Sequence, residues 1–375
     1  MRVLVAMSGG VDSSVAAALM LRAGHEVVGA TMKLWGGPSD SGCCSVADVE
    51  DARRVCQQLG IAHHVFNFTS DFDRDVVTPY VEAHARARTP NPCIACNAHL
   101  KFGRFLQRAP LLGFDAIATG HHARVTKSGT TWQLRRGRDV AKDQSYVLYM
   151  LGQAELARVL LPIGELTKEH VRRAASDLDL RTAGKPDSQD VCFISKTGGR
   201  ASFVADRIPL REGRLVSTSG DDLGAVDALE LVTVGQRRGL GLHAVSLPER
   251  RYVVDVDLPR RTATVGTLED LLVERLQIED LSWSHLPLVP DTAVQVQLSA
   301  HGRPLRGQWL GGPEPDSGRI VLEEPTRRVA PGQAVVLYAP GSGDGAAADS
   351  GRVGHVPDTG GGLGGEVVLG GGTAA

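Results

Sequence analysis

The sequence predicts an α/β chain in which an N-terminal doubly wound parallel sheet is followed by a small central β-rich domain and a C-terminal β-barrel. Strand and helix patterns alternate over the first 205 residues, whereas short strand-like runs separated by turn residues dominate afterwards. The length of 375 residues, with 42% hydrophobic and 22% charged residues, is typical of a globular protein with two or three domains. We expect domains at 1–205, 206–272 and 273–375.

The N-terminal domain begins with the apolar run Val3-Leu4-Val5-Ala6, which is typical of a buried strand. A Gly-rich turn follows, and the next two helical patterns stop at Gly24 and Gly60. We expect strands at 3–6, 26–34, 61–68 and 115–119, and helices at 14–22, 46–59, 75–87 and 97–109. Such alternation predicts a parallel sheet covered on both faces, with ligands at the carboxyl ends of its strands.

The second half of the chain contains short β-type runs instead. We expect strands at 214–216, 252–254, 293–298, 319–322 and 334–338, which predicts small β domains that end in a closed barrel. Residues 341–365 are dominated by Gly, Ala, Asp and Ser, so we expect a disordered insert there. The run 366–369 predicts one last strand beyond the insert.

Composition limits the partners and the compartment. The net charge is -2, so a nucleic-acid partner has to be met by local basic patches and not by a global field. No apolar stretch approaches the roughly 20 residues that span a bilayer, and no signal peptide opens the chain. We therefore expect a soluble, cytoplasmic protein without membrane contact, in which the six cysteines form no permanent disulfide bonds.

The segment Ser8-Gly9-Gly10-Val11-Asp12-Ser13-Ser14 lies between the first strand and the first helix. Glycines let the backbone approach a phosphate, and the amides and the helix N-terminus then donate hydrogen bonds to it. Asp12 would repel phosphate directly, which favours a role in holding a bridging Mg²⁺. The segment lacks the Gly-Lys-Ser/Thr of a Walker A loop, which argues against a kinase or GTPase. The alternative reading is a plain Gly-Ser turn.

This loop resembles the PP-loop of the ATP pyrophosphatase superfamily, whose members cleave ATP between its α and β phosphates and adenylate a carbonyl oxygen. The superfamily includes amidotransferase-type synthetases and tRNA thiolases, and the loop alone does not choose among them. Two segments that contain cysteines distinguish among these families. They are Thr89-Pro90-Asn91-Pro92-Cys93-Ile94-Ala95-Cys96-Asn97 and Asp187-Ser188-Gln189-Asp190-Val191-Cys192-Phe193-Ile194.

Together with four further segments, the two cysteine segments make the chain similar to the tRNA-specific 2-thiouridylases. The four are Ala118-Thr119-Gly120-His121-His122, Lys142-Asp143-Gln144-Ser145-Tyr146, Gly235-Gln236-Arg237-Arg238-Gly239 and Leu369-Gly370-Gly371-Gly372. That family makes 2-thiouridine at the wobble position of certain tRNAs. The resemblance runs from the first strand to the last glycines, interrupted mainly by the insert at 341–365.

The resemblance implies a role for each matching residue. The ATP site would be lined by Ala6, Met7, Ser8, Gly9, Gly10, Val11, Asp12, Ser13 and Met32, with Gly120 close by. The target base would meet Asn91, Pro92 and Cys93, and the tRNA would also meet His121, Lys142, Asp143, Gln144 and Gln333. Cys96 matches the nucleophile and Cys192 the cysteine that carries a persulfide. An Arg-Tyr-type tRNA contact expected in the last domain is not obvious, because Ser299, Ala300 and His301 stand there.

The chemistry explains why these residue types are needed. Uracil O2 is a poor leaving group until ATP adenylates it and pyrophosphate departs. A persulfide on Cys192 would supply the sulfur, and Cys96 would cleave the sulfur–sulfur bond through a mixed disulfide. A cysteine desulfurase or a sulfur-relay protein would have to supply that persulfide.

Other interpretations of the cysteines stay open. Cys93, Cys96 and Cys192 could instead hold a [4Fe–4S] cluster whose fourth iron carries the sulfide. Cys93-x-x-Cys96 could be half of a zinc site, although a second pair is missing. A PP-loop ligase that amidates with ammonia would need no cysteine pair, and a non-catalytic RNA-binding protein would need no intact loop. Cys43 and Cys44 have no assigned role, and Cys56 is expected in the core.

Overall fold

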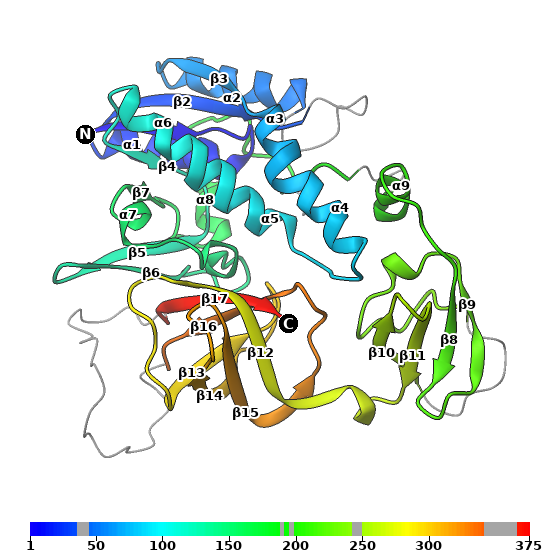
Figure 1. Ribbon diagram of the computed structural model, residues 1–375. Helices are drawn as coiled ribbons and strands as arrows, with labels where there is room; N and C mark the ends of the chain where they lie inside the picture. The colour runs from blue at the N-terminus through cyan, green and yellow to red at the C-terminus, as the bar shows by residue number, and fades with distance from the viewer. Residues whose placement is uncertain (36–44, 188–190, 195–198, 242–249, 341–365) are drawn as a thin grey trace.

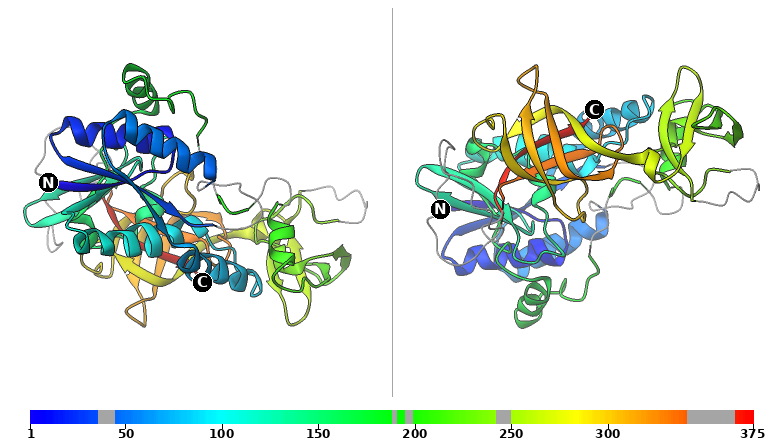
Figure 2. Two further views of the ribbon diagram at one scale, coloured as in Figure 1. Left: turned by 90° about the horizontal axis from the view of Figure 1, so that it is seen from above. Right: turned by 90° about the horizontal axis from the view of Figure 1, so that it is seen from below.

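The computed structural model describes residues 1–35, 45–187, 191–194, 199–241, 250–340 and 366–375. A layered α/β part, a small β sheet and a β-barrel follow one another along the chain (Figure 1). The two views of Figure 2 both show the small sheet projecting to one side of the α/β part and the barrel. The expected order of the three architectures is therefore confirmed, whereas the expected domain boundaries stay predictions.

The α/β part is built on five parallel strands in the order β3-β2-β1-β4-β7. The strands are β1 (Arg2–Ala6), β2 (Glu26–Lys33), β3 (His63–Asn67), β4 (Ala116–Ala118) and β7 (Val159–Leu160). The chain runs outward from β1 to β3 and then returns to the other side of β1. The strand order thus reverses between β1 and β4, and ligands bind at such a reversal.

Both faces of this sheet are covered because the side chains of β1 alternate between two apolar clusters. Val3 and Val5 pack with α1 (Val11–Arg22), α2 (Val46–Gln58) and α8 (Lys168–Asp177). Leu4 and Ala6 pack on the opposite face with the helix that contains α5 (Pro92–Ala95), a π-helical stretch (Cys96–Phe105) and α6 (Leu106–Leu111). Burial on both faces explains why the strands read as continuous apolar runs.

Three expected helices differ from those observed at their ends, and the one expected at 97–109 already begins at Pro92 and runs to Leu111. Helix α1 begins at Val11 and not at residue 14, which puts Asp12 and Ser13 in its first turn. The helix expected at 75–87 begins earlier, as α3 (Thr69–Phe72), and runs through a π-helical stretch (Asp73–Val77) into α4 (Thr78–His84). Sequence patterns did not predict the hairpin of β5 (Ala123–Ser128) and β6 (Thr131–Arg136), nor α7 (Gln153–Leu156), α8 and α9 (Gly199–Ala205).

The central sheet has the order β10-β11-β8-β9, of which only two strands were expected from the sequence. Its strands are β8 (Gly213–Ser217), β9 (Asp222–Val226), β10 (Tyr252–Asp257) and β11 (Thr262–Gly266). They enclose a small apolar cluster that includes Leu215, Val253 and Val265, each with no exposed surface.

The third part is a closed barrel with the order β12-β15-β14-β13-β16-β17. Its strands are β12 (Leu272–Trp283), β13 (Thr292–Gln297), β14 (Leu305–Gly311), β15 (Gly318–Arg327), β16 (Ala334–Tyr338) and β17 (Val368–Ala374). The expected last strand is confirmed and pairs with both β16 and β12. A Cβ on Gly372 would lie 2.3 Å from the carbonyl oxygen of Glu279, so the closing glycines let this strand fit.

The strands on either side of the insert meet at their ends. The backbone N–H of Ala339 donates to the carbonyl of Val367 at 2.8 Å. The expected disordered insert at 341–365 lies outside the described residues.

Arg136, at the end of β6, ties the α/β part to the barrel. Its guanidinium donates to Asp143 at 3.0 Å and to Gln297 of β13 at 2.7 Å, and it also pairs with Glu366. It lies over the ring of Tyr338 at 3.7 Å. These groups are largely buried, so the joint is a polar network inside an otherwise apolar contact.

Candidate active site

The phosphate loop lies at the carboxyl end of β1, next to the reversal of strand order. The hydroxyls of Ser8 and Ser13 lie 3.1 Å apart, and the backbone N–H of Ser8 donates to Ser13 Oγ at 3.2 Å. The hydroxyls of Ser13 and Ser14 donate to the carbonyl of Gly10 at 3.1 and 2.8 Å. These bonds hold the turn that leads into α1, whose N-terminus suits an anion.

Glycine is required at two positions around this loop. Gly9 has φ +73°, and a Cβ there would lie 2.2 Å from the carbonyl oxygen of Asp48. Gly120, just beyond β4, would carry a Cβ only 2.6 Å from the amide nitrogen of Ser13. The predicted ATP residues Ser8–Ser13 and Gly120 are therefore together. Ala6 and Met32 lie buried in β1 and β2, and Met7 is buried directly after β1.

Asp12 carries the negative charge of the loop and is compensated by two bases. Lys168 Nζ lies 2.7 Å from both carboxylate oxygens, and His122 Nε2 lies 3.3 Å from one of them. Burial alone would raise the pKa of Asp12, but hydrogen bonds and positive charge from His122 and Lys168 lower it. Asp12 is thus a carboxylate at neutral pH, which suits a hard cation such as Mg²⁺.

Two charged residues that precede the Cys192 segment contact the phosphate loop or its cation Lys168. Lys185 Nζ donates to the carbonyl of Gly9 at 2.9 Å and pairs with Asp48 and Asp51. Two residues later, Asp187 pairs with Lys168 at 3.0 Å, and also with Lys142 at 2.8 Å and Arg172 at 2.6 Å. Partial burial would raise the pKa of Asp187, but hydrogen bonds from the lysines lower it well below its usual range. Ser188–Asp190 lie outside the described residues.

Cys192 itself is held by its neighbour. The ring of Phe193 packs against Phe72, Tyr80 and Phe203 at centroid distances of 5.5, 5.6 and 5.1 Å, and against Trp35 at 6.2 Å. Cys192 is half-buried against the same core cluster to which Cys96 belongs. Both cysteines therefore contact one large apolar cluster, which also extends to Leu4 of β1 and Tyr338 of β16.

Cys93 and Cys96 lie one turn apart at the start of the helix that begins with α5. Asn91 caps this helix, since its Oδ1 accepts the backbone N–H of Cys93 at 3.0 Å. The loop before it is fixed to the barrel, because Gln333 Nε2 donates to the carbonyl of Thr89 at 2.8 Å. Four residues predicted to contact tRNA, Asn91, Pro92, Cys93 and Gln333, therefore belong to one junction between the α/β part and the barrel.

The other predicted tRNA contacts are engaged within the protein. His121 is buried and lies 2.7 Å from Thr119 Oγ1, and burial lowers its pKa well below the usual value. The carboxylate of Asp143 accepts from Gly137, Ser145 and Arg136. Gln144 Oε1 accepts the backbone N–H of His122 at 2.9 Å. Lys142 is exposed but paired with Asp187, so its contact, like the other three, stays a prediction.

Cys56 has no exposed surface, and burial raises the pKa of its thiol to about 11, so its expected place in the core is confirmed. Cys43 and Cys44 lie outside the described residues. In the described part of the chain, no group of three or more His, Cys, Asp or Glu side chains is arranged to hold a metal ion. Cys93, Cys96 and Cys192 are all described, and their role as cluster ligands stays a prediction. No helix in the described ranges is long and apolar enough to cross a membrane.

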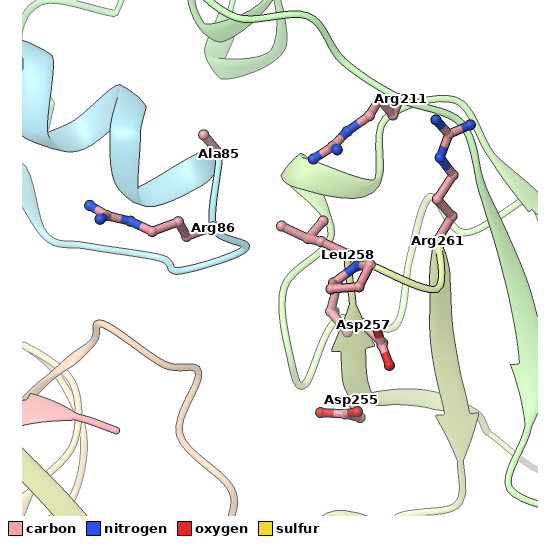
Figure 3. Close-up of a pocket in the computed structure, with 9 residues that line it drawn as sticks. Ala85, Arg86, Arg211, Asp255, Asp257, Leu258 and Arg261 are labelled. Atoms are coloured by element: carbon pink, nitrogen blue, oxygen red, sulfur yellow. The ribbon is translucent and has the colours of Figure 1, made fainter.

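A cavity of about 770 Å³ lies elsewhere, between the end of α4 and the central sheet. It is lined by residues 85–86, Arg211, residues 255–259 and Arg261, and Figure 3 shows Arg211 and Arg261 above Asp255 and Asp257. Arg211 also pairs with the buried Glu230. The cavity carries mixed charge and contains none of the predicted site residues.

Comparisons with known proteins bear on this arrangement. A model described as "tRNA methyl transferase HUP domain" matches residues 1–196, and one described as "tRNA methyl transferase PRC-barrel domain" matches 201–267. The tRNA-specific 2-thiouridylase MnmA of Chloroflexus aggregans (strain MD-66 / DSM 9485) is 46% identical over 90% of this chain and 94% of its own. The chain belongs to the tRNA-specific 2-thiouridylase family.

Other relatives agree with this membership. The 2-thiouridylase MnmA of Corynebacterium glutamicum (strain R) is 41% identical over 95% of this chain and 99% of its own. Among solved structures, a 4-thiouridine synthetase–RNA complex with bound ATP is 18% identical with a TM-score of 0.35, covering 51% of this chain and 44% of that one. That likeness is too low to add to the family assignment.

Sequence reasoning missed three charged residues of this 2-thiouridylase site. Lys168, Lys185 and Asp187 surround the phosphate loop, yet none was predicted to act there. They lie 156 to 175 positions from Asp12 in sequence, and no pattern in the chain indicates that α8 packs beside α1. The only signal was the lack of a lysine in the loop itself, which leaves a phosphate-binding cation to come from elsewhere.

Proposed function

We propose that this chain is an ATP-dependent tRNA-uridine 2-sulfurtransferase that acts on the wobble uridine. The observation that carries the proposal is the position of the described residues on either side of 188–190. Lys185 donates to Gly9 of the phosphate loop, and Asp187 pairs with Lys168, which in turn pairs with Asp12. Cys192 and Phe193 pack on the apolar cluster that also includes Cys96. This arrangement supports a link between the ATP chemistry and the sulfur chemistry. The descriptions of the family models mention methyl transfer, but a phosphate loop beside a cysteine pair fits adenylation and thiolation.

In the first step, uracil O2 would attack the α phosphate of ATP and release pyrophosphate. The loop amides and α1 would hold the phosphates, and Asp12 would hold the Mg²⁺ that neutralises their charge. Asp12 is prepared for this because it is already ionised. The activated base would then carry AMP as its leaving group.

In the second step, the terminal sulfur of a persulfide on Cys192 would attack C2, and AMP would leave. Cys96 would then attack the Cys192 sulfur, so that the C2–S bond stays with the base and a Cys96–Cys192 disulfide forms. An external thiol would reduce that disulfide, and a cysteine desulfurase or sulfur-relay protein would reload the persulfide. The tRNA would enter at the junction of Asn91, Cys93 and Gln333.

The [4Fe–4S] alternative requires more of the thiols. A cluster is held by thiolates that converge on it, so Cys93, Cys96 and Cys192 would all have to meet at one point. The persulfide route needs only two thiols, because the persulfide on Cys192 attacks the base and Cys96 then attacks the Cys192 sulfur.

The test measures pyrophosphate release and the 2-thiouridine content of tRNA separately. Wild-type protein should release pyrophosphate only with tRNA and, with a persulfide donor, should form 2-thiouridine. Cys192→Ser should still release pyrophosphate but form no product, whereas Asp12→Ala should do neither. Pyrophosphate release without any product from the wild type, supplied with donor and tRNA, would contradict the proposal.

Cys93→Ala separates the two sulfur mechanisms. The persulfide route predicts that this variant remains active with a persulfide donor, and that anaerobically purified wild type contains no iron. An inactive Cys93→Ala together with a cluster absorbance in the wild type would support the cluster instead.

A further inference from the structure

Lys168 is a buried cation between two carboxylates that belong to different parts of the site. Its side chain is only 11% exposed, and it begins α8. Its Nζ lies 2.7 Å from both oxygens of Asp12 on the phosphate loop and 3.0 Å from Asp187 at the head of the Cys192 segment. A buried ammonium is costly unless it is paired, so such a position has to be maintained by a strong interaction.

The phosphate loop supplies no cation of its own. Between Ala6 and Arg22 the chain has no lysine or arginine, unlike a Walker A loop, whose lysine reaches the β and γ phosphates. Among the described residues near the loop, Lys185 already donates hydrogen bonds to the carbonyl of Gly9 and to the carboxylates of Asp48 and Asp51. Lys142 and Arg172 pair instead with Asp187.

We propose that Lys168 binds the β and γ phosphates of ATP and that, in doing so, it gives up its ion pair with Asp187. The inference rests on the proposed use of ATP by this loop. Asp12 would hold the Mg²⁺, and Lys168 would then be available to the phosphates. Asp187 remains paired with Lys142 and Arg172, so nucleotide binding removes only one of the three ion pairs of Asp187. The state of the ATP site is thereby transmitted to the segment that bears Cys192, and Lys168 acts as a positioning residue between them.

The first experiment measures nucleotide affinity by titration calorimetry with Mg²⁺. The probes are α,β-methylene-ATP, which the enzyme cannot cleave between its α and β phosphates, and AMP, which lacks the β and γ phosphates. Lys168→Met should weaken α,β-methylene-ATP by about 10- to 100-fold, the value of a charge-assisted contact, and change AMP by less than about 3-fold. Lys168→Arg should recover part of the loss.

Arg173→Met is the matched control. Arg173 lies on the same helix, is 61% exposed and pairs with Glu169, so this variant removes the same charge without touching the loop. Its affinity for both nucleotides should equal that of the wild type. Thermal unfolding of all variants shows whether a loss of affinity reflects a loss of fold.

The second experiment is a double-mutant cycle with Asp187→Asn. Because Asp187 competes for Lys168, this change should tighten α,β-methylene-ATP about 3- to 10-fold in the wild-type background and leave it unchanged in Lys168→Met. Equal tightening in both backgrounds would show that Asp187 acts only through its charge, which would overturn the exchange. Equal weakening of α,β-methylene-ATP and AMP by Lys168→Met would overturn the phosphate contact.

Failure of this inference differs from failure of the proposed function. If wild-type protein binds neither nucleotide, the use of ATP is wrong and Lys168 has no phosphate to bind. If the wild type and Lys168→Met bind α,β-methylene-ATP equally well, the ATP site stands and the role of Lys168 is wrong.

Discussion

At the scale of single residues, Gly9 decides whether the phosphate loop can form. Its φ of +73° and the close approach of the Asp48 carbonyl leave no room for a side chain. We expect Gly9→Ala to abolish detectable binding of α,β-methylene-ATP while the protein stays folded, because the strain is confined to the turn. Calorimetry and thermal unfolding check this.

Gly24→Ala is the comparison variant. Gly24 also has positive φ, +79°, but a Cβ there would meet no atom within 4 Å. It should lose about 1 kcal/mol of stability and keep its nucleotide affinity. If both variants bind nucleotide normally, the close contact with Asp48 does not matter for the loop.

The sequence predicted site residues that lie close together along the chain. It did not predict site residues that only the folded structure brings to the loop. Ser8–Ser13 lie on one turn, so their meeting requires only a strand followed by a helix. Lys168 reaches the same turn through the packing of α8 against α1, and Asp187, beyond the end of α8, pairs with Lys168. Both positions depend on side-chain fit across the whole α/β part. Asp143 shows a further limit of the sequence, because nothing in it indicates that the carboxylate of a residue matched to RNA binding is also hydrogen-bonded inside the protein.

At the scale of elements, α4 ends in a histidine that makes stability depend on pH. His84 is buried beside Tyr80, with Arg200 nearby and a hydrogen bond with the backbone of Glu230, and burial lowers its pKa to about 4. An unfolded histidine has a pKa near 6.5. Between these values the unfolded chain binds the extra proton, so stability falls as the pH drops from 6.5 towards 4.

We expect the His84 contribution to fall by about 2 kcal/mol between pH 7 and pH 5. Urea unfolding of the wild type and of His84→Phe at both pH values measures this contribution. Other buried groups such as His121 titrate in both proteins, so their effect cancels in the comparison. The wild type should lose about 2 kcal/mol more than the variant over this interval. Parallel losses would show that His84 is not the group responsible.

The hairpin of β16 and β17 should not depend on the insert between its strands. Deleting 342–364 would leave a short connection between Ala339 and Val367, which are already hydrogen-bonded. We expect stability to change by less than about 1 kcal/mol and thiolation to be retained, because loop length contributes little. Deleting 339–364, which removes that hydrogen bond, is the destabilised comparison, and unfolding of the shorter deletion would show the insert to be structural.

Elements with a strong apolar period were predicted well, and weakly patterned ones were not. Strand β1 and helix α2 are continuous apolar or amphipathic runs, and both appear within a residue or two of the expected ends. Strand β12 alternates charged residues with few large apolar ones, and β17 contains three consecutive glycines. Their pairing is decided by barrel closure and not by their own composition.

At the scale of the whole molecule, the barrel and the α/β part are joined through a buried charge. Replacing Arg136 by methionine would leave Asp143 buried without its guanidinium partner and remove the bond to Gln297. We expect a loss of about 3–5 kcal/mol in the free energy of unfolding, as measured by urea denaturation. Arg138→Met, an exposed position two residues along, should change it by less than about 0.5 kcal/mol.

The hydrogen bond between Ala339 and Val367 also marks a site at which another domain or a label can be attached to the protein. The chain leaves and re-enters the barrel at one point, so a guest domain whose own termini lie close together could be inserted there without pulling the strands apart. That point lies at the opposite end of β16 from Gln333, about 20 Å away along the strand. A fluorophore or surface anchor carried there would report on the enzyme while leaving open the RNA entrance that we propose beside Gln333.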